Sequence, residues 1–374
     1  MRIKQFLIIT LILVASCRQP YNPPAVKVNN NFLVVDGFLN ATPNSVTTIS
    51  LSRTRNLVDT INRKPEENAE VFIEEASGVT IRLSPQGNGL YSSSSFINPS
   101  GSYQLKITTI DGSQYQSEFV PVVNTPPIDS LTWEQKDDAR IFVFSHNPAN
   151  NIWYYHWDYT ETWEYVSNFE TVYGVNSNNI IFERDTSNQI YHCWRNNNST
   201  DIVIGNSLKL NQDIINHFPI TVIPQNSAKI AIRYSILVNQ YGLTKEGYEF
   251  WQTLQKNTQQ VGSIFDPQPS QLKSNIHNIT NPKEPVMGFF SASTVQQKRI
   301  FINHRNLVNW VYNGPDQPGC STKELPSSFP YYNYPDTTFV PYYFTAGGNI
   351  MVIIQAPCVD CTRHGGTNHK PSYW

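Results

Sequence analysis

From Phe32 onward the chain is a series of short segments rich in β-branched and aromatic residues, each bounded by Gly, Asn or Ser. The segments in its N-terminal part are Phe32–Phe38, Val46–Leu51, Val71–Glu75, Val79–Leu83 and Tyr103–Ile110. Asp111-Gly112 and the segment 75–78 have the composition of hairpin turns. Strands this short and this closely spaced predict an all-β sandwich, immunoglobulin-like or fibronectin-like, over 32–124.

A pair of prolines, Pro126 and Pro127, interrupts this pattern, and proline pairs punctuate a chain where strands end. We therefore expect a larger β-rich domain over 125–374. Its predicted strands include Ser130–Trp133, Ile141–Phe144, Lys229–Val238, Val286–Ala292, Arg299–Ile302 and Ile350–Ile354. In the aromatic stretch from Trp153 to Tyr165, large side chains alternate along the chain, which favours a strand over a helix. The fold class predicted for the whole chain is mainly β.

One segment of the second region has a helical pattern. Thr244 can cap the first turn of a helix, Tyr248, Trp251 and Leu254 recur at three-residue spacing, and Gly262 stands where a helix would stop. These features predict one prominent helix near 245–261. Because a short helix is stabilised mainly by its apolar stripe, we expect Trp251 and Leu254 to be buried.

The N-terminus has the pattern of an export signal. Arg2 and Lys4 precede the apolar run Phe6–Val14, and small residues lead into Cys17. The run is about half of the roughly 20 residues needed to cross a bilayer, so it predicts a signal peptide over 1–16 and no membrane span. The pattern resembles a bacterial lipobox, in which the cysteine is acylated, with palmitate for example, and becomes the new N-terminus. Residues 17–31 then form a tether; an ordinary signal peptide with an incidental Cys17 is the alternative.

The composition excludes two other classes of protein. Charged residues make up 15% of the chain and aromatic residues 13%, the opposite of the balance found in disordered chains. The formal net charge is −2, which does not provide the dense positive surface that nucleic acid requires. We therefore expect a folded protein with no nucleic-acid partner.

Four cysteines remain in the mature chain: Cys193, Cys320, Cys358 and Cys361. An even number in an exported protein predicts two disulfides with three possible connectivities. We favour Cys193 with Cys320 and Cys358 with Cys361. The alternative is a zinc site, because His364 and His369 follow the last two cysteines at ligand-like spacing. No metal or cofactor is expected.

Catalytic motifs for nucleophilic elbows, zinc proteases and nucleotide binding are missing from the sequence. Asp158, Glu161 and Glu164 lie among tryptophans, a setting that could bind a sugar and protonate its leaving group. A glycosidase needs two carboxylates at a defined separation, which spacing in the sequence cannot establish. The favoured interpretation is an aromatic strand with its acids facing water, and no catalytic residue is assigned.

Two further segments have alternative interpretations. The loop 266–269 (DPQP) is either a binding loop or a proline-stiffened connector. The Gly365-Gly366 pair and the terminal Trp374 are expected to dock the C-terminus onto the fold.

Six short motifs occur in the order found in a known family: VVDG at 34–37, LSRT at 51–54, PPIDS at 126–130, GSIFDPQPS at 262–270, GFFSAS at 288–293 and the tail from Cys358 to Pro371. Together they resemble the Bacteroidota outer-membrane lipoproteins that carry domain of unknown function 4249, over essentially the whole mature chain. The resemblance implies an outer-membrane lipoprotein encoded beside a TonB-dependent receptor, and it supplies no catalytic residue. Surface lipoproteins of this phylum tend to carry acidic residues soon after the acylated cysteine. Here the segment Arg18-Gln19-Pro20-Tyr21 has none, so both the outer and the periplasmic face of the outer membrane are possible locations.

Two functions follow as hypotheses. The first is a non-enzymatic accessory of a TonB-dependent receptor in ligand capture, uptake or envelope assembly, with exposed aromatic side chains as its contact platform. The alternative is a tethered polymer-degrading hydrolase that uses Asp158, Glu161 or Glu164. Convergence of two carboxylates in one cleft would favour the hydrolase.

Overall fold

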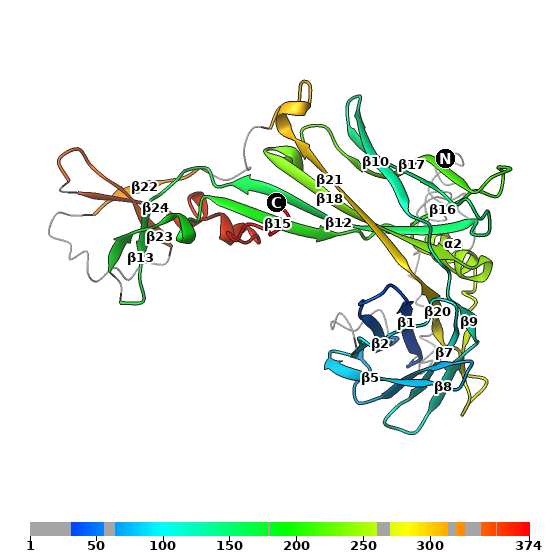
Figure 1. Ribbon diagram of the computed structural model, residues 1–374. Coiled ribbons are helices and arrows are strands. Elements are labelled where there is room, and N and C mark those ends of the chain that lie inside the picture. The colour runs from blue at the N-terminus through cyan, green and yellow to red at the C-terminus, as the bar shows by residue number, and fades with distance from the viewer. Residues whose placement is uncertain are drawn as a thin grey trace, which may run out of the picture.

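The computed structural model describes residues 31–55, 64–178, 180–259, 270–312, 319–325, 338–348 and 350–374. In this part of the chain the protein is mainly β, with a single α-helix, as predicted. Figure 1 shows an elongated molecule: a large N-terminal sheet lies at one end, small sheets lie at the other, and long strands run between them. None of the helices in the described ranges is long and apolar enough to cross a membrane.

The N-terminal sheet is large and nearly closed. Its strands along the main path are β19 (Ile276–Asn278), β8 (Gln114–Ser117), β7 (Ser102–Thr108), β4 (Glu70–Glu75), β5 (Thr80–Gly87), β6 (Leu90–Ser93), β2 (Thr47–Arg53), β1 (Leu33–Asn40) and β20 (Met287–Ser293), with β3 (Lys64–Pro65) on β2 and β9 (Val120–Pro121) on β7. The Asn275 side chain links the two edges, donating to the Phe290 carbonyl at 2.8 Å and accepting from the Phe290 N–H at 2.8 Å. A specific immunoglobulin-like or fibronectin-like topology stays a prediction.

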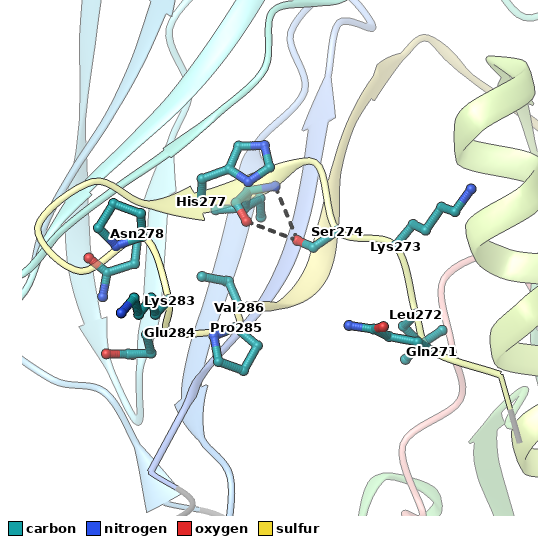
Figure 2. A pocket seen from close by; sticks show the side chains of 12 residues that line it. Gln271, Leu272, Lys273, Ser274, His277, Asn278, Lys283, Glu284, Pro285 and Val286 are labelled. Carbon is teal, nitrogen blue, oxygen red and sulfur yellow. Dashed lines mark hydrogen bonds between the residues drawn. The ribbon is translucent and has the colours of Figure 1, made fainter.

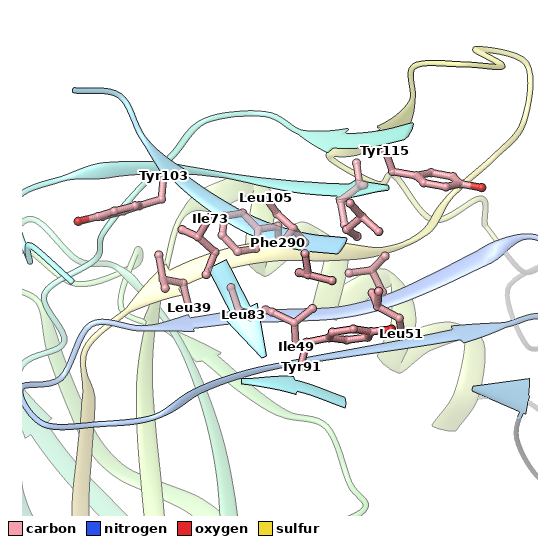
Figure 3. Close-up of a cluster of buried hydrophobic side chains, with 14 of the residues drawn as sticks. Leu39, Ile49, Leu51, Ile73, Leu83, Tyr91, Tyr103, Leu105, Tyr115 and Phe290 are labelled. Atoms are coloured by element: carbon pink, nitrogen blue, oxygen red, sulfur yellow. The ribbon is translucent and has the colours of Figure 1, made fainter. Parts of the chain in front are cut away.

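The core of this sheet follows from alternation along its strands. In β1, Leu33, Val35 and Leu39 point inward and are buried, since successive side chains of a strand face opposite sides. Figure 3 shows this core, in which Phe290 of β20 lies among side chains from the first hundred or so residues. Ile276 and Val286 belong to the same cluster. The N-terminal core is therefore completed by a segment that lies far beyond residue 124.

Two sheets pack face to face in the middle of the molecule. The central sheet contains β15 (His192–Asn198), β12 (Tyr154–Val166), β18 (Arg233–Leu243) and β21 (Val295–Asn303), with β16 (Val203–Asn206) also on β12; the covering sheet contains β10 (Ile128–Gln135), β11 (Ala139–His146) and β17 (Ile214–Ile223). Tyr155, Trp157 and Tyr159 of β12 are buried against Ile141 and its neighbours on the covering sheet. The aromatic stretch is a strand, as expected, but this face of it forms a core and not an exposed platform.

The distal end consists of two small sheets, one of β13 (Tyr173–Val175) and β14 (Ile181–Glu183), the other of β22 (Thr322–Glu324), β24 (Met351–Gln355) and β23 (Phe339–Phe344). Phe339, Met351 and Ile353 are buried there, and Tyr173 and Ile181 pack against them. The two sheets therefore share one small core.

All four cysteines form disulfides, but the favoured pairing is wrong. Cys193 bonds to Cys361 and Cys320 bonds to Cys358, with Cα–Cα distances of 5.8 and 6.0 Å. Cys358 and Cys361 end and begin two consecutive short 3₁₀ turns, Ala356–Cys358 and Cys361–His364, and the second turn lies against β15. Each cysteine therefore meets a different neighbour. The zinc alternative is also wrong, because both thiols are consumed and no group of potential ligands gathers in the described ranges.

The helix α2 (Lys245–Gln259) begins where predicted, and Thr244 Oγ1 accepts from the Gly247 N–H at 3.2 Å. Its buried residues are Gly247, Tyr248 and Phe250, so the prediction that Trp251 and Leu254 are buried is wrong; both are partly exposed. Phe250, and not its neighbour Trp251, faces the protein interior. Its ring stacks on Phe289 of β20, with ring centroids 5.3 Å apart. Residues 260 and 261 of the predicted helix lie outside the described residues.

Candidate functional site

The three candidate acids lie on β12 but do not converge. Asp158 and Glu164 share one face of the strand and Glu161 points to the other, because side chains alternate along it. Six residues separate Asp158 from Glu164, which corresponds to about 20 Å at roughly 3.3 Å per residue. That distance is about twice the largest carboxylate separation of glycosidases, roughly 9.5 Å, so the arrangement does not match that chemistry.

Asp158 and Glu161 are both engaged in internal hydrogen bonds. The expectation that these acids face water is therefore wrong for both of them. Asp158 accepts from Asn239 Nδ2 at 2.5 Å and from Tyr241 Oη at 2.7 Å. Glu161 is 3% exposed and accepts from Lys229 Nζ at 2.5 Å and Tyr234 Oη at 2.8 Å. Burial, together with the charge of Glu161, raises the pKa of Tyr234 well above its usual value, so the phenol keeps its proton and donates it to Glu161.

The third acid, Glu164, holds the C-terminus, which confirms the expected docking of Trp374. The Glu164 carboxylate accepts from Trp374 Nε1 at 3.2 Å and lies 3.1 Å from His192 Nδ1. The guanidinium of Arg233 lies 5.2 Å from the Trp374 ring centre, and Phe301 meets the same ring edge-on at 5.7 Å. Glu164 therefore has a structural partner of its own.

Two of the features singled out in the sequence, Cys17 and the loop 266–269, lie outside the described residues. His364 Nε2 donates to the Pro357 carbonyl oxygen at 2.8 Å, and His369 lies on the exposed tail. Neither histidine has a metal-binding arrangement within the described ranges.

Two adjoining clefts flank the segment that runs from Ser270 to Val286. The first, which we call the acidic cleft, has a volume of about 570 Å³ and lies between this segment, α2 and β20. Glu118, Glu246 and Glu249 line it together with Phe250 and Phe289. Glu249 lies 3.7 Å from Lys245, and Glu118 lies 3.6 Å from His277, so two of the three acids have a basic neighbour.

The second cleft, which we call the Asn278 cleft, has a volume of about 510 Å³ and is lined by residues 271–274, 276–278 and 282–286. Figure 2 shows Asn278, Lys283 and Glu284 at one end, and Gln271 and Lys273 at the other, toward α2. Ile276 and Val286 are buried side chains of its apolar lining. Hydrogen-bond donors therefore stand at both ends of an apolar floor.

Asn278 holds an unusual position in this lining. It is 2% exposed, and its Oδ1 accepts from the Asn281 N–H at 2.8 Å, which fixes the orientation of the amide. Its Nδ2 is buried and has no acceptor in the described part of the chain. Nearly all buried polar groups in native proteins have a partner, so this donor marks a specific place in the cleft.

A charged network forms the wall behind Glu284. Tyr115 Oη donates to Glu284 Oε1 at 3.1 Å, and Arg53 Nη1 donates to Tyr115 Oη at 3.2 Å and lies 4.0 Å from Glu284. Burial disfavours the charged form of Arg53, but its hydrogen bonds to Glu66 and Tyr115 outweigh this and raise its pKa. Arg53 therefore stays charged; it pairs closely with Glu66 at 2.5 Å and lies between that acid and Glu284.

The sequence did not indicate Lys273, Asn278 or Lys283 as site residues. Their only local signal is the pair Pro282 and Pro285 around Lys283, which is typical of any surface turn. The cleft exists because the segment after α2 crosses back to the edge of the N-terminal sheet, where β19 pairs with β8. The cleft therefore depends on the tertiary structure and not on a local sequence pattern.

Comparisons with known proteins identify a family of unknown function. One similar solved structure is "Putative membrane anchored protein from Corynebacterium diphtheriae", with 10% identity, 57% of this chain and 55% of that chain covered, and a TM-score of 0.17. The chain thus spans about half the length of that protein, and a likeness this weak carries no argument. No curated protein sequence matches the chain. The model of the family described as "Domain of unknown function (DUF4249)" matches residues 18–299, about three quarters of the chain, and the chain therefore belongs to that family.

Proposed function

We propose that this protein is a lipoprotein of the outer membrane of Bacteroidota, anchored through an acylated Cys17 after removal of residues 1–16. Its role is that of a non-enzymatic accessory to a TonB-dependent receptor, in ligand capture, uptake or envelope assembly. The family match over 18–299 is consistent with this role but names no function. The export signal ending at Cys17 supports the anchor.

One observation carries the non-enzymatic part of the proposal. The candidate acids are held apart, and each has a structural partner, whereas the Asn278 cleft contains donors without acceptors. Paired acids that stabilise a fold are poorly placed to give or take a proton, while unsatisfied donors in a cleft favour binding of an acceptor. Capture of a ligand therefore fits this geometry better than hydrolysis.

Affinity purification of the tagged full-length protein from detergent-solubilised outer membranes tests the proposal. A TonB-dependent receptor should co-purify with the wild-type protein. Cys17→Ala is the matched control: it should leave the membrane fraction, or keep its signal peptide, and lose the receptor. Normal membrane partition and maturation of Cys17→Ala would contradict the anchor, and a wild-type sample without any receptor would contradict the accessory role.

The hydrolase alternative has its own measurement. The purified mature protein is incubated with a panel of polysaccharides, and new reducing ends are counted. We expect no release above a heat-treated sample. Release that disappears in Asp158→Asn or Glu161→Gln, in variants whose circular dichroism matches wild type, would replace the accessory role by an enzymatic one.

A further inference from the structure

We propose that the Asn278 cleft binds the carboxylate of an organic ligand whose adjoining part is apolar. Asn278 Nδ2 and Lys283 are the donors to the carboxylate, and Lys273 binds a second acceptor of the same ligand. This inference deepens the proposed capture function by naming the class of ligand, and it rests on that function only for its biological setting. The chemistry is shared by a free acylated amino acid and by the C-terminal residue of a peptide.

The first step of the argument is the unsatisfied amide. Asn278 Nδ2 is buried and unpaired within the described residues, while Oδ1 is already bound to the Asn281 N–H. A buried donor without a partner costs the free energy of removing that group from water. An acceptor oxygen placed in the cleft recovers this energy, so the site favours a ligand that brings one.

The second step is the charge of the lining. No ion pair or hydrogen bond of Lys273 or Lys283 occurs among the described residues. The acid of the lining, Glu284, is already bound by Tyr115 and lies beside Arg53, and His277 lies 3.6 Å from Glu118 outside the cleft. The lining thus contains two lysines and one acid, a formal charge of +1, and this positive charge attracts an anion.

The third step is size and shape. A volume of about 510 Å³ lies within the range of small-molecule sites, roughly 300–1,000 Å³. Ile276, Pro285 and Val286 provide an apolar floor between the donor pair at Asn278 and Lys283 and the donors at Lys273 and Gln271. An apolar body buried on that floor distinguishes an organic carboxylate from a fully polar anion such as inorganic phosphate.

Isothermal titration calorimetry on the purified mature chain tests the proposal with defined probes. N-acetyl-leucine represents the free acid and N-acetyl-Ala-Ala-Leu the peptide C-terminus. Their C-terminal amides and inorganic phosphate are the controls. Both acids should bind, with the amides and phosphate about tenfold weaker or worse, since one charge-assisted hydrogen bond accounts for about a factor of ten or more. The tighter of the two acids identifies the source of the ligand.

Variants connect the binding to the cleft. Asn278→Leu and Lys283→Met should each weaken N-acetyl-leucine about tenfold, and Lys273→Met by a smaller factor. Lys209→Met is the matched control, because Lys209 is exposed and lies outside the cleft lining, and it should leave the affinity unchanged. Thermal unfolding of each variant checks the fold; Lys283→Met removes an exposed side chain and should unfold at the wild-type temperature.

Several outcomes overturn the proposal. The first is the absence of saturable binding of either acid up to about 10 mM, which corresponds to roughly 3 kcal/mol of binding free energy. The second is binding of the amides or of phosphate as tight as that of the acids. The third is an affinity that Lys283→Met leaves unchanged. The receptor purification separates this failure from that of the accessory role. A receptor retained without probe binding removes only the cleft assignment, and probe binding without a receptor removes only the partner.

Discussion

Gly288 of β20 lies opposite Val35 of β1 in a parallel pair, so close that a Cβ at Gly288 would stand 1.9 Å from the Val35 carbonyl oxygen. The φ of Gly288 is +126°, a backbone conformation that other residues rarely adopt. Both residues belong to short motifs of the sequence, VVDG and GFFSAS, that are more than 250 residues apart. Their contact joins the second region of the chain to the N-terminal sheet.

Gly288→Ala should destabilise the protein by about 3 kcal/mol or more, because the methyl group forces β20 away from β1 and adds backbone strain. Urea unfolding followed by tryptophan fluorescence measures the change. Gly112→Ala is the matched control: its φ is also positive, +84°, but nothing lies within 4 Å of the added Cβ. It should cost only about 1–2 kcal/mol. Equal losses in the two variants would show that strain, and not the close approach, dominates.

The disulfides give a second prediction. Peptide mapping of the unreduced protein should recover Cys193 linked to Cys361 and Cys320 linked to Cys358. Replacing the first pair by serine should destabilise the chain by roughly 1 kcal/mol more than replacing the second, because its loop of 168 residues is longer than the loop of 38. A peptide in which Cys358 is joined to Cys361 would contradict the structure.

His156 should make stability depend on pH. Burial between the rings of Trp251 and Tyr241 lowers the pKa of His156 to about 4, although the nearby Asp158 charge acts in the opposite direction. The unfolded chain takes up this proton near pH 6.5 and the folded protein only near pH 4, so stability falls as the pH falls between these values. At pH 5 the loss should be roughly 1–2 kcal/mol.

His156→Phe isolates this contribution, since it keeps a ring between Trp251 and Tyr241 and removes the titrating group. Urea unfolding of both proteins at pH 7.5 and pH 5 gives the comparison. The wild-type protein should lose more stability than the variant over this interval. Identical losses would assign the pH dependence to the other histidines.

The packing face of α2 gives a fourth prediction. Phe250→Ala should cost about 3–5 kcal/mol, because Phe250 is buried against Phe289. Trp251→Ala should cost less, about 1–2 kcal/mol, since Trp251 is partly exposed and stacks on His156 with ring centroids 4.5 Å apart. Denaturant unfolding of the two variants decides the order, and a larger loss in Trp251→Ala would mean that the helix packs through its tryptophan.

Local pattern determined most of the secondary structure. The alternation in β1 and β12 and the turn residues at Asp111-Gly112 placed strands and hairpins within a few residues of their observed bounds. Thr244 marked the start of α2. These features depend on neighbours along the chain, which the sequence contains in full.

The tertiary structure alone decided which distant segments meet. β20 completes the N-terminal sheet, Cys193 bonds to Cys361, and Trp374 binds Glu164, although no local pattern specifies any of these partners. The face of α2 that is buried depends on where Phe289 lies, and the Asn278 cleft forms only because the segment after α2 returns to β8. Each of these arrangements depends on the packing of whole sheets, so it follows from shape and burial summed over the fold and not from the residues nearby in the chain.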